Sequence, residues 1–281
     1  MGGAYPLRQC AVMDKEEQKH MDRVEEARRT LLALYGGSHS PLEESDPDFA
    51  AIKQRLVYGE LYAQEALDPV MRELILLAVA TTNQTMSEVK LHTCAALRSG
   101  ASPEAVKEAV YHCAPYIGLG KAEAAAAAVN EVLRTQGISL PLASQRTVSE
   151  EDRLTAGIAA QKSIFGPHID EMRAAAPNDQ KPLQDYLSAY CFGDFYTRSG
   201  LDIRQRELLT FSILSAQGGC ENQIKAHAGG NAAVGNDKPL LLAALMLCMP
   251  YIGLPRTLNA LSCVDQVLPE LPEGDRPSPQ K

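Results

Sequence analysis

The chain of 281 residues contains an internal duplication, which limits its possible folds more than any other feature of the sequence. Seven residues recur 134 positions later: Gly59, Tyr62, Leu67, Asp68, Arg72, Glu73 and Leu74 correspond to Gly193, Tyr196, Leu201, Asp202, Arg206, Glu207 and Leu208. A second set recurs 135 positions later: His92, Gly100, Cys113 and Pro115–Leu119 correspond to His227, Gly235, Cys248 and Pro250–Leu254. We therefore expect two tandem copies of one domain, at residues 20–137 and 150–268, followed by a disordered tail at residues 269–281.

The local signals within each copy favour helices. Asp68-Pro69 and Ser102-Pro103 each combine an N-cap residue with proline at the first helical position. Residues 70–82 form a leucine-rich run that is too long for a typical strand, and residues 121–133 are rich in alanine. No segment shows a convincing alternation of apolar and polar residues. The sequence therefore predicts an all-helical fold made of two repeated domains.

Charge and hydropathy exclude several classes of partner. The chain has 27 basic and 35 acidic residues, a net charge of −8, which argues against general nucleic-acid binding and against docking on anionic membranes. The longest uncharged run has seventeen residues, Pro239–Pro255, and is interrupted by proline, whereas a membrane-spanning helix needs about 20 apolar residues. The first fifteen residues lack a signal-peptide pattern, so we expect a cytoplasmic protein whose seven cysteines are free thiols.

Three residues of the first repeat share one face of a predicted helix. Thr85, Glu88 and His92 lie at positions i, i+3 and i+7, and the duplicated positions hold Cys220, Gln223 and His227. Glu88 and His92 are four residues apart and can touch. Seven residues of helix rise about 10.5 Å, so direct contact between Cys220 and His227 is not expected.

This pattern suggests different chemistry in the two repeats. The first repeat resembles an acid–base site, in which Glu88 orients His92. The second resembles a thiol site, because Cys220 should lie in the first turn of its helix, where the helix dipole favours a thiolate. The alternatives are structural: each histidine can be a core residue, and Cys220 can be a small buried side chain.

Two further carboxylates, Glu73 and Glu207, lie on apolar helix faces. Such a carboxylate is either paired, for example with Arg72 or Arg206, or shifted toward its protonated form, which suits proton transfer. Glu88 and His92 offer two metal ligands, but no third is visible nearby, and no glycine-rich phosphate loop follows a strand. We therefore expect neither a metal nor a nucleotide cofactor.

The duplicated motifs resemble those of the carboxymuconolactone decarboxylase family, which also contains alkylhydroperoxidase D. The family pattern is an Arg-Glu-Leu helix start, a reactive segment that ends in histidine, and Ala-Pro-Tyr-x-Gly-x-Pro. The second repeat matches with Arg206–Leu208, Cys220–His227 and Met249–Arg256. The first matches with Arg72–Leu74, Glu88–His92 and Ala114–Leu119, and then departs at Gly120-Lys121.

The resemblance implies an alkylhydroperoxidase D-like helical fold and, for a tandem chain, a homotrimer. It implies either of two activities, both on a small-molecule substrate. One is a cofactor-independent lyase or isomerase on a small carboxylated lactone or related acid, in which Glu88 and His92 act as acid and base. Glu73 and Glu207 would assist in this reaction, and His227 would be the duplicated catalytic position. Arg256 would hold a substrate carboxylate.

The other implied activity is a thiol peroxidase centred on Cys220. Its family members use a Cys-x-x-Cys pair, but Gln223 stands at the resolving position here and the first repeat has Thr85 and Glu88. An external thiol would therefore have to resolve a sulfenic acid on Cys220. A third reading is a non-catalytic binding or assembly protein whose duplicated sites have decayed.

Overall fold

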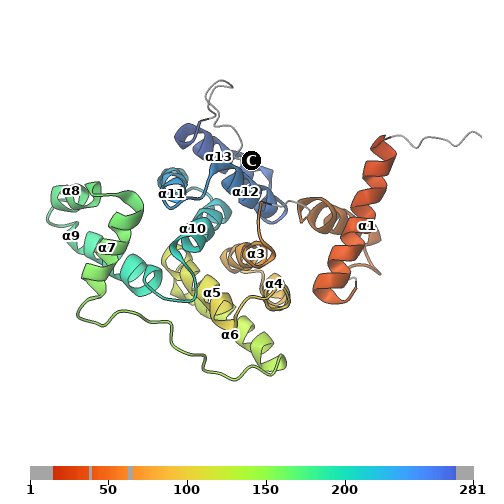
Figure 1. Ribbon diagram of the computed structural model, residues 1–281, viewed down its shortest axis with the longest axis horizontal. Helices are drawn as coiled ribbons and strands as arrows, with labels where there is room; N and C mark the ends of the chain where they lie inside the picture. Colours follow the sequence, from red (N-terminus) through yellow and green to blue (C-terminus); the bar gives the residue numbers. More distant parts are fainter. Residues whose placement is uncertain (1–14, 38–39, 63–65, 270–281) are drawn as a thin grey trace, which may run out of the picture. The chain divides into compact units, whose positions relative to one another are not determined.

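The computed structural model describes residues 15–37, 40–62 and 66–269, and every regular element in these ranges is a helix (Figure 1). This confirms the predicted all-helical fold for the described part of the chain. No helix within those ranges is long and apolar enough to cross a membrane. The expected tail lies outside the described residues from residue 270 onward.

Contacts divide the chain into two compact units, residues 1–64 and 65–281. The first unit contains α1 (Lys15–Tyr35), α2 (Pro47–Gln54) and a π-helical continuation, η1 (Arg55–Leu61). Within it, α1 packs against η1 at Gly59, where a Cβ would overlap the backbone oxygen of Arg23. An ion pair between Arg23 and Glu60 joins the same two helices.

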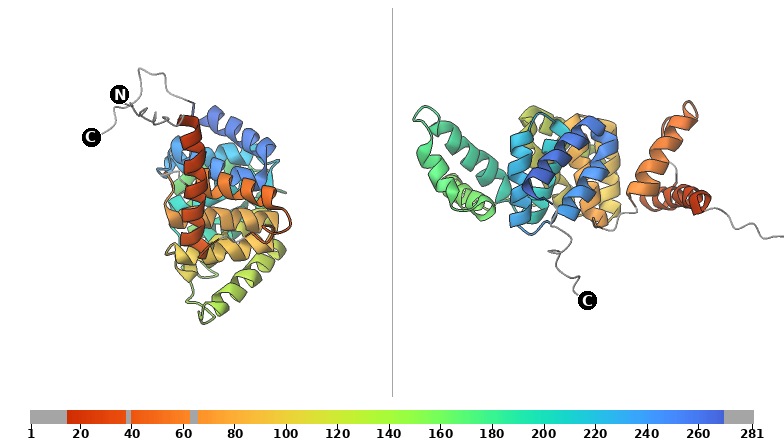
Figure 2. Two further views of the ribbon diagram at one scale, coloured as in Figure 1. Left: turned by 90° about the vertical axis from the view of Figure 1, so that its right-hand side faces the viewer. Right: turned by 90° about the horizontal axis from the view of Figure 1, so that it is seen from above.

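In the second unit, the last four helices of each repeat form a bundle. The first repeat contributes α3 (Pro69–Asn83), α4 (Met86–Arg98), α5 (Pro103–Ile117) and α6 (Leu119–Thr135). The second contributes α10 (Ile203–Gln217), α11 (Glu221–Ala233), α12 (Lys238–Ile252) and α13 (Leu254–Val267). Helices α3 and α10 pack against each other in the middle of this bundle (Figures 1 and 2).

The repeats are interlocked inside this unit. Helix α5 of the first repeat also packs on α10 of the second, and α12 of the second packs on α3 of the first. The compact units therefore do not coincide with the predicted repeats at 20–137 and 150–268, whose boundaries stay a prediction. The interlocking means that each repeat can place side chains beside the buried residues of the other.

The predicted helix starts are present at α3 and α5. The Asp68 carboxylate accepts a hydrogen bond from the Met71 N–H at 2.9 Å, and the Ser102 hydroxyl accepts one from Ala105 at 3.1 Å. At α10, Asp202 forms a full capping box with Gln205. These caps satisfy backbone donors that a helix start leaves without partners, and they fix where α3 and α10 begin.

The start of the second repeat forms α7 (Arg153–Phe165), α8 (His168–Ala175), α9 (Lys181–Tyr186) and the π-helical η2 (Leu187–Tyr196). Helices α7 and η2 cross closely: a Cβ at Gly193 would overlap the Arg153 backbone oxygen, and Arg153 pairs with Asp194. The same glycine crossing and ion pair join α1 to η1. The duplication therefore extends to the first helices of both repeats, although their surrounding sequences differ.

Gly193→Ala should destabilise the second unit, because the α7–η2 crossing leaves no room for a methyl group. We expect a loss of about 1–3 kcal/mol in the free energy of unfolding, measured by urea denaturation. Gly120→Ala is the matched control, since nothing lies within 4 Å of its Cβ position and alanine favours helix over glycine. Equal stability of the two variants would contradict the close crossing.

Candidate functional site

The second repeat contains a buried carboxylate–histidine pair. Glu207, in the second turn of α10, is fully buried, and its Oε2 lies 2.9 Å from Nδ1 of His227 on α11. The His227 side chain retains 11% exposure. Because the carboxylate accepts the proton on Nδ1, the Nε2 atom is the nitrogen left to exchange a proton with a substrate.

The first repeat contains the equivalent pair with a second carboxylate beside it. Glu73 Oε2 lies 2.8 Å from His92 Nδ1, and Glu88 Oε2 lies 3.5 Å from His92 Nε2. Burial by itself lowers the pKa of His92, but the hydrogen bonds and charges of Glu73 and Glu88 outweigh it and raise that pKa. His92 is completely buried, and it lies between two carboxylates where His227 has one, because the residue equivalent to Glu88 is Gln223.

Each histidine lies against a tyrosine from the other repeat. The Tyr251 ring, on α12, is edge-on to His92 with ring centroids 5.7 Å apart. The Tyr116 ring, on α5, is edge-on to His227 at 6.3 Å. The duplicated Pro-Tyr-Ile-Gly motifs thus complete each other's sites. Sequence reasoning recognised this motif but did not assign its tyrosine to a site.

The two repeats differ in the surroundings of Oε1, the glutamate oxygen that does not contact the histidine. The Tyr196 hydroxyl, from η2, donates a hydrogen bond to Glu207 Oε1 at 2.7 Å and lies 2.7 Å from the Thr210 hydroxyl. Phe165 packs edge-on against His227 at 5.3 Å. In the first repeat, Glu73 Oε1 is buried and has no hydrogen-bond partner within the described part of the chain. Glu73 and Glu207 are therefore both buried, but within the described residues only Glu207 has hydrogen-bond partners for both carboxylate oxygens.

A buried ion pair lies behind the Glu207 site. Arg206, which is fully buried, contacts the Glu108 carboxylate at 3.0 Å, and Arg198 contacts the same carboxylate at 2.8 Å. His112, on α5, lies beside them, with its Nε2 atom 2.9 Å from the Thr210 hydroxyl. Burial and the positive charge of Arg206 hold the pKa of His112 well below its usual value, so this imidazole is neutral.

Cys220 does not have the environment of a reactive thiolate. It is the N-cap of α11, at the predicted helix start, and its thiol donates to the Gly218 carbonyl at 3.3 Å. Burial and the negative charge of Glu221 raise its pKa, opposite in direction to the shift expected from the helix dipole. The helix position was correct, but burial and a neighbouring carboxylate, which the spacing did not reveal, determine the thiol's acidity.

Arg256 supports the same turn. Its guanidinium donates to the Ala216 carbonyl at 2.7 Å, near the end of α10, and its side chain packs on Gly218. Part of the guanidinium therefore caps a helix, while the residue as a whole is exposed. Among the described residues, no group of three or more His, Cys, Asp or Glu side chains is arranged to hold a metal ion.

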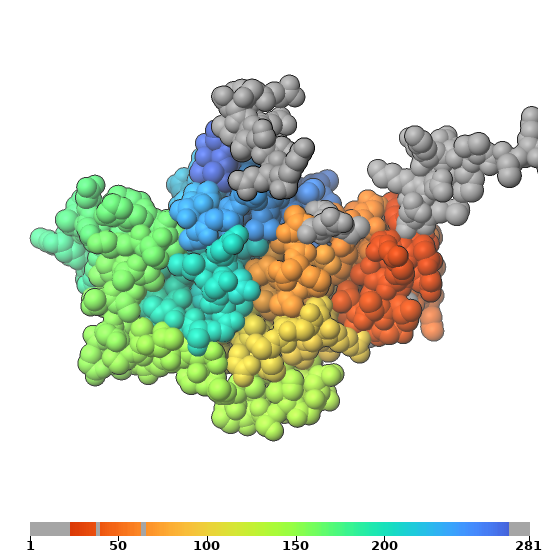
Figure 3. All heavy atoms as spheres, viewed as in Figure 1, coloured from red at the N-terminus to blue at the C-terminus, as the bar shows by residue number. Residues whose placement is uncertain are grey.

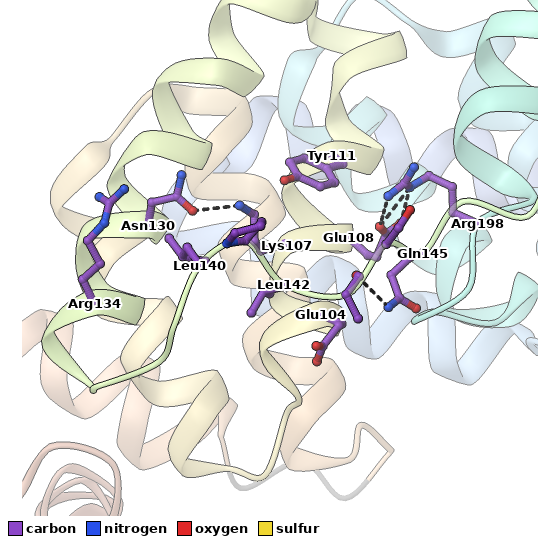
Figure 4. A pocket seen from close by; sticks show the side chains of 13 residues that line it. Glu104, Lys107, Glu108, Tyr111, Asn130, Arg134, Leu140, Leu142, Gln145 and Arg198 are labelled. Atoms are coloured by element: carbon purple, nitrogen blue, oxygen red, sulfur yellow. Dashed lines mark hydrogen bonds and ion pairs between the residues drawn. The ribbon is translucent and has the colours of Figure 1, made fainter.

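Two cavities lie away from the histidines. One, of about 370 Å³, is bounded by the 140–145 segment and includes Glu108, Tyr111 and Arg198 in its wall (Figure 4). The other, of about 300 Å³, lies between the starts of α3 and α10, where orange and teal surfaces meet in Figure 3. Neither is lined by His92 or His227. The carboxylate–histidine pairs contain groups that can transfer a proton, which cavity size alone does not supply.

The fold and the site define a class of protein, an all-helical tandem repeat with a buried glutamate–histidine pair in each half. The carboxymuconolactone decarboxylase family model matches residues 47–131 and 181–266, and the chain belongs to this family. Two family domains therefore lie in tandem. The 4-carboxymuconolactone decarboxylase of Acinetobacter baylyi is 29% identical over 125 residues, which cover 44% of this chain and 92% of that protein.

Gly230→Ala should disturb the Glu207–His227 pair. A Cβ at Gly230 would lie 2.6 Å from Glu207 Oε2 and 2.9 Å from Ile164, so the carboxylate would have to move. We expect a loss of about 1–3 kcal/mol in unfolding free energy, together with a changed His227 ring resonance in NMR spectra. The control is Gly229→Ala, whose Cβ would make only an ordinary 3.7 Å contact with Val267. Unchanged His227 resonances in folded Gly230→Ala would contradict the close packing.

Stability should fall on both sides of about pH 6.5, the ordinary histidine pKa. The folded state raises the pKa of His92. Protonated His92 therefore contributes to the free energy of unfolding below pH 6.5, and this contribution is lost as pH rises through the folded pKa. The folded state lowers the pKa of His112, so stability is lost as pH falls below 6.5, where the unfolded chain binds a proton that the folded chain does not.

Each proton contributes at most about 1.4 kcal/mol per pH unit to this dependence. Urea denaturation between pH 5 and 8 measures it. His92→Gln should flatten the loss above pH 6.5 and leave the loss below pH 6.5 in place. The same slope above pH 6.5 in wild type and variant would show that His92 is not held protonated by its carboxylates.

Proposed function

We propose that this protein is a cofactor-independent carboxy-lyase, or a related isomerase, that acts on a small carboxylated lactone or similar acid. The observation that carries the proposal is the buried Glu207–His227 pair, whose Nε2 atom is not used by the carboxylate. Family membership supports the reaction class, and the name of the Acinetobacter relative supports the substrate class.

In this proposal the substrate itself stabilises the charge of the reaction. Breaking the bond to the carboxylate releases CO₂ and leaves the electron pair on the ring carbon, where the conjugated lactone carbonyl delocalises it. The protonated His227 Nε2 then donates a proton to that carbon, and a hydronium ion or buffer acid from the solvent restores the proton to the histidine, so that the reaction consumes one proton for each CO₂ released. Glu207 holds the ring in place through Nδ1 and stabilises the imidazolium before the proton is transferred.

The other site residues take supporting or parallel roles. Glu88, His92 and Glu73 would perform the same acid–base chemistry in the first repeat, although His92 is fully buried and must become accessible first. Arg256, whose guanidinium is only partly used in capping, would hold the substrate carboxylate. A homotrimer, expected from the family resemblance, would be the assembled form.

No specific observation favours the thiol peroxidase. The raised pKa of Cys220 disfavours the thiolate at neutral pH, and Gln223 provides no second thiol. The non-catalytic alternative, in which the duplicated sites only bind, is an outcome of the experiment below.

His227→Gln should reduce CO₂ release from 4-carboxymuconolactone at least about 100-fold, because it removes the proton donor. Glu207→Gln should reduce it less, since the imidazole remains. The control is His168→Gln, which changes an exposed histidine on α8 and should leave the rate unaltered. Equal rates in His227→Gln and wild type would refute the assignment. If wild-type protein binds this or related lactone acids but neither releases CO₂ from them nor isomerises them, the binding alternative is correct.

A further inference from the structure

We infer that the second-repeat site is built by both repeats, with His112, Thr210 and Tyr116 acting as positioning residues for the Glu207–His227 pair. Two of these three come from helix α5 of the first repeat. The inference rests on the proposed function for its catalytic consequence. Its structural content rests on a chain of hydrogen bonds whose directions are fixed at both ends, at His112 and at Glu207.

The chain begins at His112, whose tautomer is fixed by its neighbours. Its Nε2 atom lies 3.1 Å from the Arg206 carbonyl oxygen, which can only accept, so Nε2 must carry the proton. Its Nδ1 atom lies 3.4 Å from an Arg206 guanidinium nitrogen, which can only donate, so Nδ1 must accept. His112 is therefore neutral, and its Nε2–H also points to the Thr210 hydroxyl at 2.9 Å.

The remaining directions follow in order. Thr210 accepts from His112 and donates its one proton to the Tyr116 hydroxyl at 3.0 Å or to the Tyr196 hydroxyl at 2.7 Å. The Tyr196 hydroxyl gives its proton to Glu207 Oε1, so toward Thr210 and Tyr116 it can only accept, and the Tyr116 hydroxyl lies 3.1 Å away. All four donors point toward the Glu207 carboxylate, and aligned hydrogen bonds of this kind strengthen one another. The chain therefore fixes Glu207 Oε1 while Oε2 holds His227.

The Glu73–His92 site lacks the residues that begin this hydrogen-bond chain. The positions equivalent to His112 and Thr210 hold Leu247 and Leu76, although the tyrosine equivalent to Tyr116 is present as Tyr251. Glu108, which neutralises Arg206 behind His112, is replaced by Ala243. The two repeats have therefore diverged at polar positions behind the site, while each kept its glutamate and histidine. This difference assigns the positioned histidine to the second repeat.

The test compares Tyr116→Phe with Tyr111→Phe. The second variant makes the same change on the same helix, at a residue that is not part of the hydrogen-bond chain. Tyr116→Phe should lower kcat by about 3- to 10-fold, the range for one neutral hydrogen bond, with KM unchanged. It should also move the His227 Nδ1–H proton resonance. Thr210→Val should do both, whereas Tyr111→Phe should do neither. Thermal unfolding checks that each variant is folded, and Thr210→Val decides the matter if Tyr116→Phe does not fold.

Two outcomes separate this inference from the proposed function. If His227→Gln abolishes turnover but Tyr116→Phe and Thr210→Val match Tyr111→Phe in both rate and resonance, the positioning chain is wrong and the function stands. If the wild-type protein shows no turnover, the proposed function fails. In that case the His227 resonance alone tests the hydrogen-bond chain. A shift of this resonance in Tyr116→Phe but not in Tyr111→Phe supports the hydrogen-bond chain, and no shift overturns it.

Discussion

Burying a carboxylate in a helical bundle costs several kcal/mol unless hydrogen bonds replace the water it loses. Helices α3 and α10, which pack against each other, each carry such a carboxylate, Glu73 and Glu207. A histidine on the next helix meets each of them, so α4 and α11 must pack with their histidines facing inward. This interaction connects the fold to the chemistry, because the histidine that stabilises the buried carboxylate is also the group that can move a proton.

The interlocking of the repeats follows from the same constraint. A single repeat supplies the glutamate and the histidine, but α5 and α12 cross to the opposite repeat and cover its histidine with a tyrosine. A tandem chain can then change one site without changing the other. The second repeat has a complete set of hydrogen bonds around Glu207, whereas the first has a second carboxylate, Glu88, beside a fully buried histidine.

Much of this arrangement can be predicted from the sequence, and the limits have physical causes. Asp68 and Ser102 begin helices as expected, because capping depends on only a few neighbouring residues. Glu88 and His92 approach each other because four residues of helix bring them together. The pairs Glu73–His92 and Glu207–His227 join different helices, and only tertiary packing reveals them. The same holds for Tyr116, and for Cys220, whose acidity depends on burial and on Glu221 rather than on its helix position.

The most direct evidence for the Glu207–His227 pair would be the positions of the protons on the buried imidazole rings. Long-range ¹H–¹⁵N NMR spectra of the imidazole rings report which ring nitrogen carries the proton. We predict a proton on Nδ1 of His227 and, in the neutral His112 ring, on Nε2 alone. A neutral His227 with its proton on Nε2 alone would mean that Glu207 does not hold the ring, and would contradict the central role of that pair.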